Sequence, residues 1–193
     1  MDAIVAIIIG IVSSFLSSIL FLFAAHRIKP KIEVSPKISK YTDDKGRLVY
    51  VIKIINRGIR DAVDISLVLH LLRPIKNEEA NETNTVSRSR RLQLKTSNLF
   101  KLAKRKKNEY FAFRVRCYKN IEEILKETKD SKLRFRLTAR DSFTNSPILI
   151  EQTYGLDAIR EGQFKTGNSF DIIESPTINN ERLRKMMIKQ ILS

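Results

Sequence analysis

The feature that most constrains this chain is an uncharged apolar run near its N-terminus. From Ala3 to Ala25, 23 successive residues include no Asp, Glu, Lys or Arg. A helix needs about 20 apolar residues to cross the roughly 30 Å hydrocarbon core of a bilayer, and there it must satisfy its own backbone hydrogen bonds. The run therefore predicts a membrane-spanning helix, with residues 1–28 as the anchor.

A cleaved signal peptide is the competing interpretation of this run. Such a signal has a positively charged start, a shorter apolar core and a small-residue cleavage site. Here Asp2 is the only charged residue before the run, and the apolar stretch is longer than a signal needs. Leu22 and Phe23 also stand where small residues precede a cleavage site. These features favour an uncleaved, single-pass anchor.

Basic residues gather immediately after the apolar run. One acid, Glu33, lies among five cations: Arg27, Lys29, Lys31, Lys37 and Lys40. Flanking cations remain on the cytoplasmic side of a membrane. The sequence therefore predicts a plasma or inner membrane protein with its N-terminus outside and its C-terminal domain in the cytoplasm. The expected juxtamembrane contacts to anionic lipid are Arg27, Lys29 and Lys31.

Small residues recur along one face of the predicted helix. They are spaced four residues apart, at Ala6, Gly10, Ser14 and Ser18. Such a stripe lets two membrane helices approach closely, so it predicts a homo-oligomer formed through the helix. Small residues are also common in helices that act only as tethers, and this alternative stays open. A conducting pore is disfavoured, because serines are the only polar lining that the helix offers.

The composition of the remaining chain argues against several classes of function. The formal net charge of the whole chain is +15, and nearly all of it lies outside the apolar run. One cysteine, Cys117, and two histidines exclude an intramolecular disulfide and a Cys/His zinc cluster, so no metal is expected. The sequence has no phosphate-binding glycine motif, no G-x-S-x-G and no H-E-x-x-H. We therefore nominate no catalytic residue and predict no cofactor and no enzyme activity.

Hydrophobic patterns of period two dominate residues 29–174. Strict alternation is typical of strands with one buried and one solvated face. Four strands have clear inward positions: Leu48, Tyr50, Ile52 and Ile54; Val63, Ile65, Leu67, Leu69 and Leu71; Phe111, Phe113, Val115 and Cys117; Leu133, Phe135, Leu137 and Ala139. Further strands are expected at Lys31–Ile38, Arg90–Leu94, Pro147–Tyr154 and Ser169–Ile173. About eight short strands predict an antiparallel β-sandwich, with one short crossover helix at Asn120–Lys129 that Asn120 caps.

One stretch within these strands resembles a known family. The segment IINRGIRDAVDISLVLHLL is similar to the N-x-G-x-x-x-A-x-D-V pattern of CARDB-like and related immunoglobulin-like bacterial β-sandwiches. The matching residues are Asn56, Gly58, Ala62, Asp64 and Ile65. The resemblance implies an immunoglobulin-like sandwich in which an Asn–Gly turn joins two strands and the small Ala opens the second. Such domains are often extracellular, whereas the charge pattern here predicts the cytoplasm.

Two basic segments remain outside this pattern. Residues 73–107 hold eleven Lys or Arg against three Glu, and their compact end comprises Lys101, Lys104, Arg105, Lys106 and Lys107. This cluster has three interpretations: solvated loop charge, contact with anionic lipid headgroups, or binding of nucleic acid or an anionic nucleotide. Residues 175–193 predict a basic amphipathic helix, which packs on its own domain, lies on a membrane or docks a partner.

These features together predict a membrane-anchored, non-enzymatic binding or adaptor protein. It presents a basic sandwich at the cytoplasmic face of the membrane. The expected partners are anionic lipid, a second copy of the chain through the helix, and an unknown protein or small anionic ligand, while nucleic acid is disfavoured. The alternative is an oligomeric membrane-disrupting effector of the antiviral-defence type, in which the cytoplasmic domain senses a signal.

Overall fold

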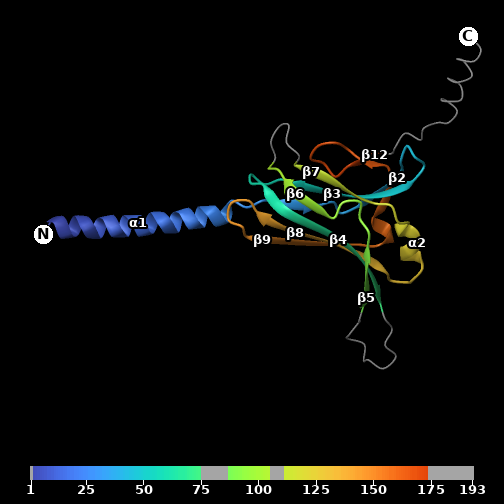
Figure 1. Ribbon diagram of the computed structural model, residues 1–193, viewed down its shortest axis with the longest axis horizontal. Coiled ribbons are helices and arrows are strands. Elements are labelled where there is room, and N and C mark those ends of the chain that lie inside the picture. The colour runs from blue at the N-terminus through green and yellow to red at the C-terminus, as the bar shows by residue number, and fades with distance from the viewer. Residues whose placement is uncertain (1, 75–86, 105–110, 174–193) are drawn as a thin grey trace, which may run out of the picture.

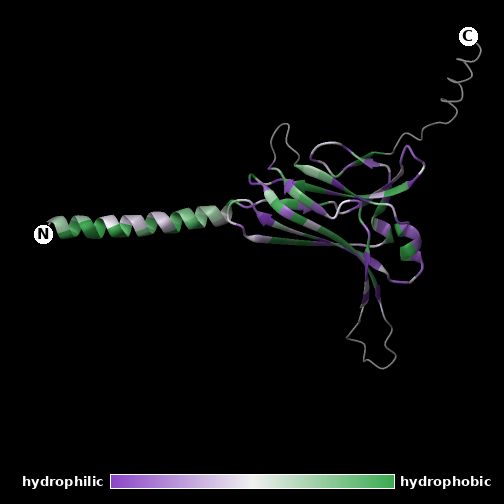
Figure 2. Cartoon of the chain, viewed as in Figure 1, coloured by the Kyte–Doolittle hydropathy of each residue, from purple (hydrophilic) through white to green (hydrophobic). Residues whose placement is uncertain are grey.

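The computed structural model describes residues 2–74, 87–104 and 111–173, and its elements are labelled in Figure 1. Helix α1 (Asp2–Arg27) extends from one end of a β-rich domain. Its stretch Ala3–Ala25 is long and apolar enough to cross a membrane, and the most apolar part is not buried by the rest of the chain. Figure 2 shows hydrophobic residues along most of the helix. The predicted apolar helix is confirmed, and its insertion into a membrane stays a prediction.

The first sheet is built around a single long strand, β3. Strands β1 and β2 follow one another along one edge of β3, and β7 pairs with its other edge. Strand β10 then pairs with β2. The bounds are β1 (Ile32–Val34), β2 (Ile38–Thr42), β3 (Leu48–Asn56), β7 (Ala112–Cys117) and β10 (Ile159–Glu161).

The second sheet is built in the same way around β4. Strands β6 and β5 occupy successive parts of one edge of β4, β8 pairs with the other edge, and β9 pairs with β8. The bounds are β4 (Ala62–Pro74), β5 (Ser87–Leu92), β6 (Asn98–Leu102), β8 (Lys132–Asp141) and β9 (Pro147–Tyr154). The remaining elements are helix α2 (Ile121–Lys126), a short 3-10 turn (Leu156–Ala158) and the strand pair β11 (Gln163–Phe164) and β12 (Ile172–Ile173).

The two sheets share one hydrophobic core. Tyr50 and Ile54 of β3 face the same cluster as Leu67 of β4 and Phe135 of β8, and all four side chains are buried. The alternation of buried and partly or fully exposed residues along β8 matches the predicted pattern throughout. Cys117 also faces this core, where burial raises the pKa of its thiol. The predicted β-rich domain is therefore confirmed, and Cys117 is buried as its inward position predicts.

Strand β3 departs from the prediction of one solvated face. Its second face is buried too, because Phe164 of β11 packs on Val49 and Val51. The strand pair β11–β12 folds back over the outside of the first sheet, so this face has a cover of its own. Period-two patterning within β3 does not reveal this cover, because the covering residues come from a segment far away in the chain.

A bulge at the start of β4 overturns the predicted orientation of Val63. The pairing of β4 with β8 shifts between Val63 and Ser66, and Asp64 between them has a positive φ of 51°. An extra residue in one strand reverses the faces on its two sides. As a result Ala62 is fully buried while Val63 is only partly buried, and the prediction that Val63 faces the core was wrong.

Two further strand predictions need correction. The expected strand Lys31–Ile38 is broken at Ser35, whose buried hydroxyl donates to the carbonyl of Lys37 and accepts from the N–H of Lys53. The expected all-antiparallel pairing is also wrong, because β10 runs parallel to β2. This parallel pair forms where the chain returns from the second sheet to the edge of the first.

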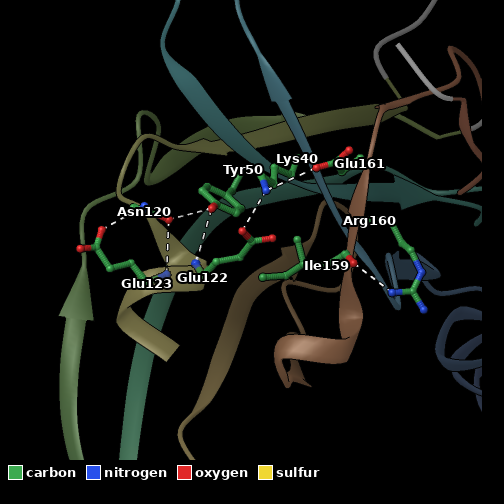
Figure 3. A network of polar contacts seen from close by, with 8 residues as sticks. All are labelled: Lys40, Tyr50, Asn120, Glu122, Glu123, Ile159, Arg160 and Glu161. Carbon is green, nitrogen blue, oxygen red and sulfur yellow. Dashed lines mark hydrogen bonds and ion pairs between the residues drawn. The ribbon is translucent and has the colours of Figure 1, made fainter. Parts of the chain in front are cut away.

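A polar network holds α2 against the first sheet (Figure 3). The Asn120 side chain caps the helix by accepting from the N–H of Glu123, as predicted. The Tyr50 hydroxyl donates to the same oxygen over 2.9 Å. Nζ of Lys40 lies 2.8 Å from Oε2 of Glu122. Strands β2 and β3 therefore both position this crossover helix.

Candidate functional site

The candidate site lies at the end of the domain from which α1 emerges, here called the helix-proximal end. It contains the β3–β4 turn (57–61) and the β8–β9 hairpin (142–146). Between α1 and β1 the chain passes directly beneath this turn, and the N–H of Arg57 donates to the carbonyl of Lys31 over 2.7 Å. A side chain on Gly58 would collide with the backbone of residues 29–31, including the Lys29 carbonyl. Glycine is thus required here for close backbone approach.

The Asn–Gly turn that the resemblance implies is present and well bonded. Asn56 is fully buried, and its Oδ1 accepts from the N–H of Gly58 over 2.9 Å. Its Nδ2 donates to the carbonyls of Arg60 at 2.7 Å and Leu102 at 3.3 Å. This side chain ties together the β3–β4 turn and the end of β6, and Ala62 opens the following strand as expected.

Arg60 joins helix α1 to the domain. Its Nη1 donates to the carbonyl of Ala25 over 3.0 Å and lies 3.3 Å from Oδ2 of Asp141. Its guanidinium stacks 4.5 Å from the ring centroid of Phe143. Phe143 in turn meets Phe21 of α1 edge to face, with ring centroids 6.4 Å apart. The cation also suits the last turn of the helix, where carbonyls carry partial negative charge.

Asp141 is the buried centre of this joint, with 1% of its surface exposed. It accepts hydrogen bonds from the N–H of Phe143 at 3.0 Å and the hydroxyl of Thr144 at 2.8 Å, besides Arg60. Burial alone would raise the pKa of Asp141, but these three donors outweigh burial and hold the pKa below its ordinary value. The carboxylate is therefore charged at neutral pH and organises the hairpin around it.

The helix-proximal end also exposes two large apolar side chains. Ile59 in the β3–β4 turn is 67% exposed and Phe143 in the β8–β9 hairpin is 62% exposed. Both belong to the two loops that contact or flank the end of α1. Water solvates large exposed apolar side chains of this kind poorly.

The structure brings part of the predicted basic cluster to this same end. Nζ of Lys101 lies 2.8 Å from Oδ2 of Asp61, and the N–H of Lys104 donates to Oδ1 of Asp61 over 2.6 Å. Burial would raise the pKa of Asp61, but the bonds from Lys101 and Lys104 hold it below its ordinary value. Lys101 lies on strand β6, which the sequence did not predict. Arg105, Lys106 and Lys107 lie outside the described residues.

The predicted juxtamembrane residues lie on the short connection to the domain. Lys29 and Lys31 are exposed, and Lys31 Nζ lies 3.7 Å from a carboxylate oxygen of Glu33. Arg27 is the last residue of α1. Lys29 and Lys31 on this connection, and Lys101 and Lys104 beside Asp61, therefore lie at the same end of the domain as Ile59 and Phe143.

The small-residue stripe of α1 is open to its surroundings. Ala6, Gly10, Ser14 and Ser18 are exposed, and nothing approaches within 4 Å of a side chain built on Gly10. The hydroxyls of Ser17 and Ser18 donate to the carbonyls four residues earlier, over 2.8 and 2.9 Å. These hydroxyls are satisfied within the helix, so close packing is the main contribution that the stripe offers to association.

Arg60, Asp141 and Phe143 were missed by the sequence analysis. Arg60 and Asp141 are far apart in the chain, and neither belongs to a motif that signals a pair.

Within the described ranges, no group of three or more His, Cys, Asp or Glu side chains is placed to hold a metal ion. The predicted C-terminal helix, residues 175–193, lies outside these ranges. No protein-family model matches this chain, and no curated protein matches it in a sequence comparison.

Proposed function

We propose that this chain is a single-pass membrane protein whose β domain is a non-enzymatic binding module held on the cytoplasmic surface of the bilayer. The observation that carries the proposal is the joint between α1 and the domain. Arg60 bonds the last turn of the helix, and Phe143 packs on Phe21. An exposed apolar helix that is fixed to its domain in this way fits a permanent anchor.

The same joint supports an anchor over a cleaved signal. Removal of the helix would expose the part of the domain that buries Ala25. It would also leave Arg60 without the Ala25 carbonyl as an acceptor. Phe143 would also lose its aromatic neighbour. A signal peptide leaves the mature domain, so residues of that domain have no reason to be built around it.

The chain order of the strands supports an immunoglobulin-like sandwich. One sheet contains the first, second and fifth strand positions of the chain, counting β1 with β2 and β5 with β6, and β10 is added at its edge as the eighth. The other contains the third, fourth, sixth and seventh positions. The division resembles that of immunoglobulin-like domains, in which the first, second and fifth strands share one sheet and the third, sixth and seventh share the other; such domains serve widely as binding modules. The well-bonded Asn56–Gly58 turn adds to the CARDB-like resemblance.

The helix-proximal end suits contact with the lipid surface. Phe21 lies four residues before Ala25, or about 6 Å along the helix axis, so in the proposed topology Phe143 would reach the level of the outermost hydrocarbon. Ile59 is a second exposed apolar side chain at this end of the domain, where Lys29, Lys31, Lys101 and Lys104 also lie. Each well-placed cation near an anionic leaflet contributes about 1 kcal/mol of attraction. The domain would thus lie directly on the headgroups.

Membrane retention and topology test this proposal. We expect the full-length protein to remain in the membrane fraction after washing at high pH, since a spanning helix resists extraction. In intact cells stripped of outer layers, added protease should spare the β domain, and it should digest the domain once the membrane is opened. Release by the high-pH wash, or digestion of the domain from outside intact cells, would contradict the proposal.

The open stripe on α1 favours a second candidate, an oligomeric membrane-disrupting effector. We expect the double substitution Gly10→Ile and Ser14→Ile to lower the native mass of the full-length protein in mild detergent, because bulkier side chains prevent close helix approach. A matched control is Ile8→Leu with Val12→Leu on the opposite face. Equal masses for the wild type and both variants would remove this candidate. Dye leakage from liposomes would then distinguish an oligomeric effector from an oligomeric adaptor.

A further inference from the structure

A cationic groove lies on the outer face of the first sheet, and none of the joint residues Arg60, Asp141 and Phe143 lines it. Its volume is about 470 Å³, and it is open to solvent. One wall is the segment between β5 and β6, and the other is the loop between β11 and β12. Its floor is formed by β3 and β7. Four cations line it, with no Asp or Glu among the lining residues: Lys53, Lys95, Arg114 and Arg116.

The sheet register brings these cations together. Lys53 of β3 is the direct partner of Arg114 on β7, so both side chains point to the same face. Arg116 lies two residues further along β7 and points the same way. The N–H of Lys95 donates to the carbonyl of Arg116 over 2.8 Å, which fixes the neighbouring wall. The clustering therefore follows from strand pairing as well as from a high overall charge.

Two of the cations, Lys53 and Arg114, bond the wall of the groove that the β11–β12 loop forms. Nζ of Lys53 donates to the carbonyls of Lys165 and Ser169, each over 2.7 Å, and Nη2 of Arg114 donates to the carbonyl of Phe164 over 2.6 Å. These bonds hold the β11–β12 loop above the sheet. Among the described residues, none of the four lining cations forms an ion pair with an acid.

Burial and neighbouring positive charge both disfavour the charged form of Lys53. Burial, followed by the positive charges of Arg114 and Arg57, lowers the pKa of Lys53 to about 8, while Asp171 acts in the opposite direction. A bound anion would relieve this repulsion and restore favourable interactions for the buried ammonium. The fold thus keeps like charges close together in a concave site, at a cost that an anionic ligand would offset.

We propose that this groove binds the phosphate group of a small anionic ligand. Guanidinium groups match phosphate oxygens with two parallel hydrogen bonds, and lysine adds a point charge. The hydroxyls of Thr96 and Thr166 also line the groove and are suitable further donors. Its volume is within the range of small-molecule sites. The inference rests on the proposed function only in treating the domain as a binding module, and it adds the ligand class.

The variant that tests this proposal removes the two cations that do not bond the β11–β12 loop. Lys95→Gln with Arg116→Gln takes two charges from the groove and leaves the bonds of Lys53 and Arg114 in place. The matched control is Arg88→Gln with Arg90→Gln on β5, where both side chains are exposed. The two variants lose equal charge, so they separate a specific site from general attraction to a basic protein.

Full-length protein in phosphatidylcholine nanodiscs would be titrated with inorganic pyrophosphate, and separately mixed with vesicles that contain phosphatidic acid. We expect the groove variant to bind about tenfold more weakly than the wild type, and the control variant to bind within about twofold. Pyrophosphate binding with this dependence supports a soluble phosphate compound as the ligand. The same dependence with vesicles alone supports a lipid phosphate.

Two results would overturn the proposal. The first is an absence of binding to both probes by the wild type, and the second is equal weakening by the groove and control variants. Pyrophosphate binding requires neither a particular membrane orientation nor retention of α1 in the bilayer. The topology test under the proposed function can therefore fail while groove binding holds, and groove binding can fail while the topology holds.

Discussion

We expect the Asp141→Ala variant of the full-length protein to unfold about 10 °C below the wild type, corresponding to a loss of roughly 3 kcal/mol. The substitution removes the buried acceptor that binds Arg60, the Phe143 N–H and the Thr144 hydroxyl. The cost is large because these donors stay partly buried without their acceptor. Thermal unfolding followed by circular dichroism in mild detergent would measure it.

Two comparisons make this expectation specific. Glu151→Ala removes an ion pair from the same hairpin strands, but Glu151 and Arg136 are both more than a third exposed, so we expect a loss below about 0.5 kcal/mol. Asp141→Asn keeps one oxygen acceptor, so we expect its loss of unfolding free energy to lie between those of Asp141→Ala and Glu151→Ala. If Asp141→Ala unfolds at the same temperature as Glu151→Ala, the carboxylate does not organise the joint.

The effect of Asp141 should also depend on pH. The folded-state pKa of Asp141 lies below its ordinary value of 3.8, so its stabilising contribution is complete above about pH 4. It is lost as the pH falls through the folded-state pKa, when the carboxyl gains a proton. The difference in unfolding free energy between wild type and Asp141→Ala should therefore narrow below about pH 4. A difference that stays constant down to pH 3 would contradict this assignment.

The Gly58→Val variant is expected to lose about 3 kcal/mol and to release the connection between α1 and β1. A valine side chain meets the backbone of residues 29–31, which cannot rotate away as a flexible side chain would. The hydrogen bond from the Arg57 N–H to the Lys31 carbonyl would then be lost. Faster trypsin cleavage after Lys31 would report the release, and a lower unfolding temperature would report the free-energy loss.

Gly46→Ala provides the control for this variant. Gly46 has a positive φ of 72°, but nothing lies within 4 Å of a side chain built there. Backbone strain alone should cost about 1 kcal/mol, without any change in cleavage after Lys31. If Gly58→Val behaves like Gly46→Ala in both measurements, close backbone approach between the β3–β4 turn and residues 29–31 does not require glycine at position 58.

Much of the fold was predictable because its signals are local. The alternation of Leu133, Phe135 and Leu137 depends only on side-chain direction along a strand, and the cap by Asn120 depends on the next three residues. The bulge that turns Val63 outward could not be predicted in this way, since its only local sign is an Asp64 that tolerates positive φ. The sequence did not predict a strand at Lys101, because the charged residues around it obscured the hydrophobic alternation of the short edge strand β6.

The candidate sites were harder to predict than the fold. The sequence identified the basic residues Lys29, Lys31 and Lys101, but charge alone does not tell which of them share a surface. That information lies in pairings such as Lys53 with Arg114, which join segments far apart in the chain. Arg60 and Asp141 carry no motif, and the pairing of β4 with β8, which places Asp141 opposite Ala62, brings them together.

The Arg60–Phe143 joint has a mechanical consequence. Because α1 is bonded and packed at its base, we expect the helix and the domain to move together instead of as two parts on a flexible tether. A helix of 26 residues is about 39 Å long, so turning the domain by about 10° swings the far end of the helix by roughly 7 Å. If α1 spans a bilayer as proposed, an event that tilts the domain on one side would be transmitted to the other side.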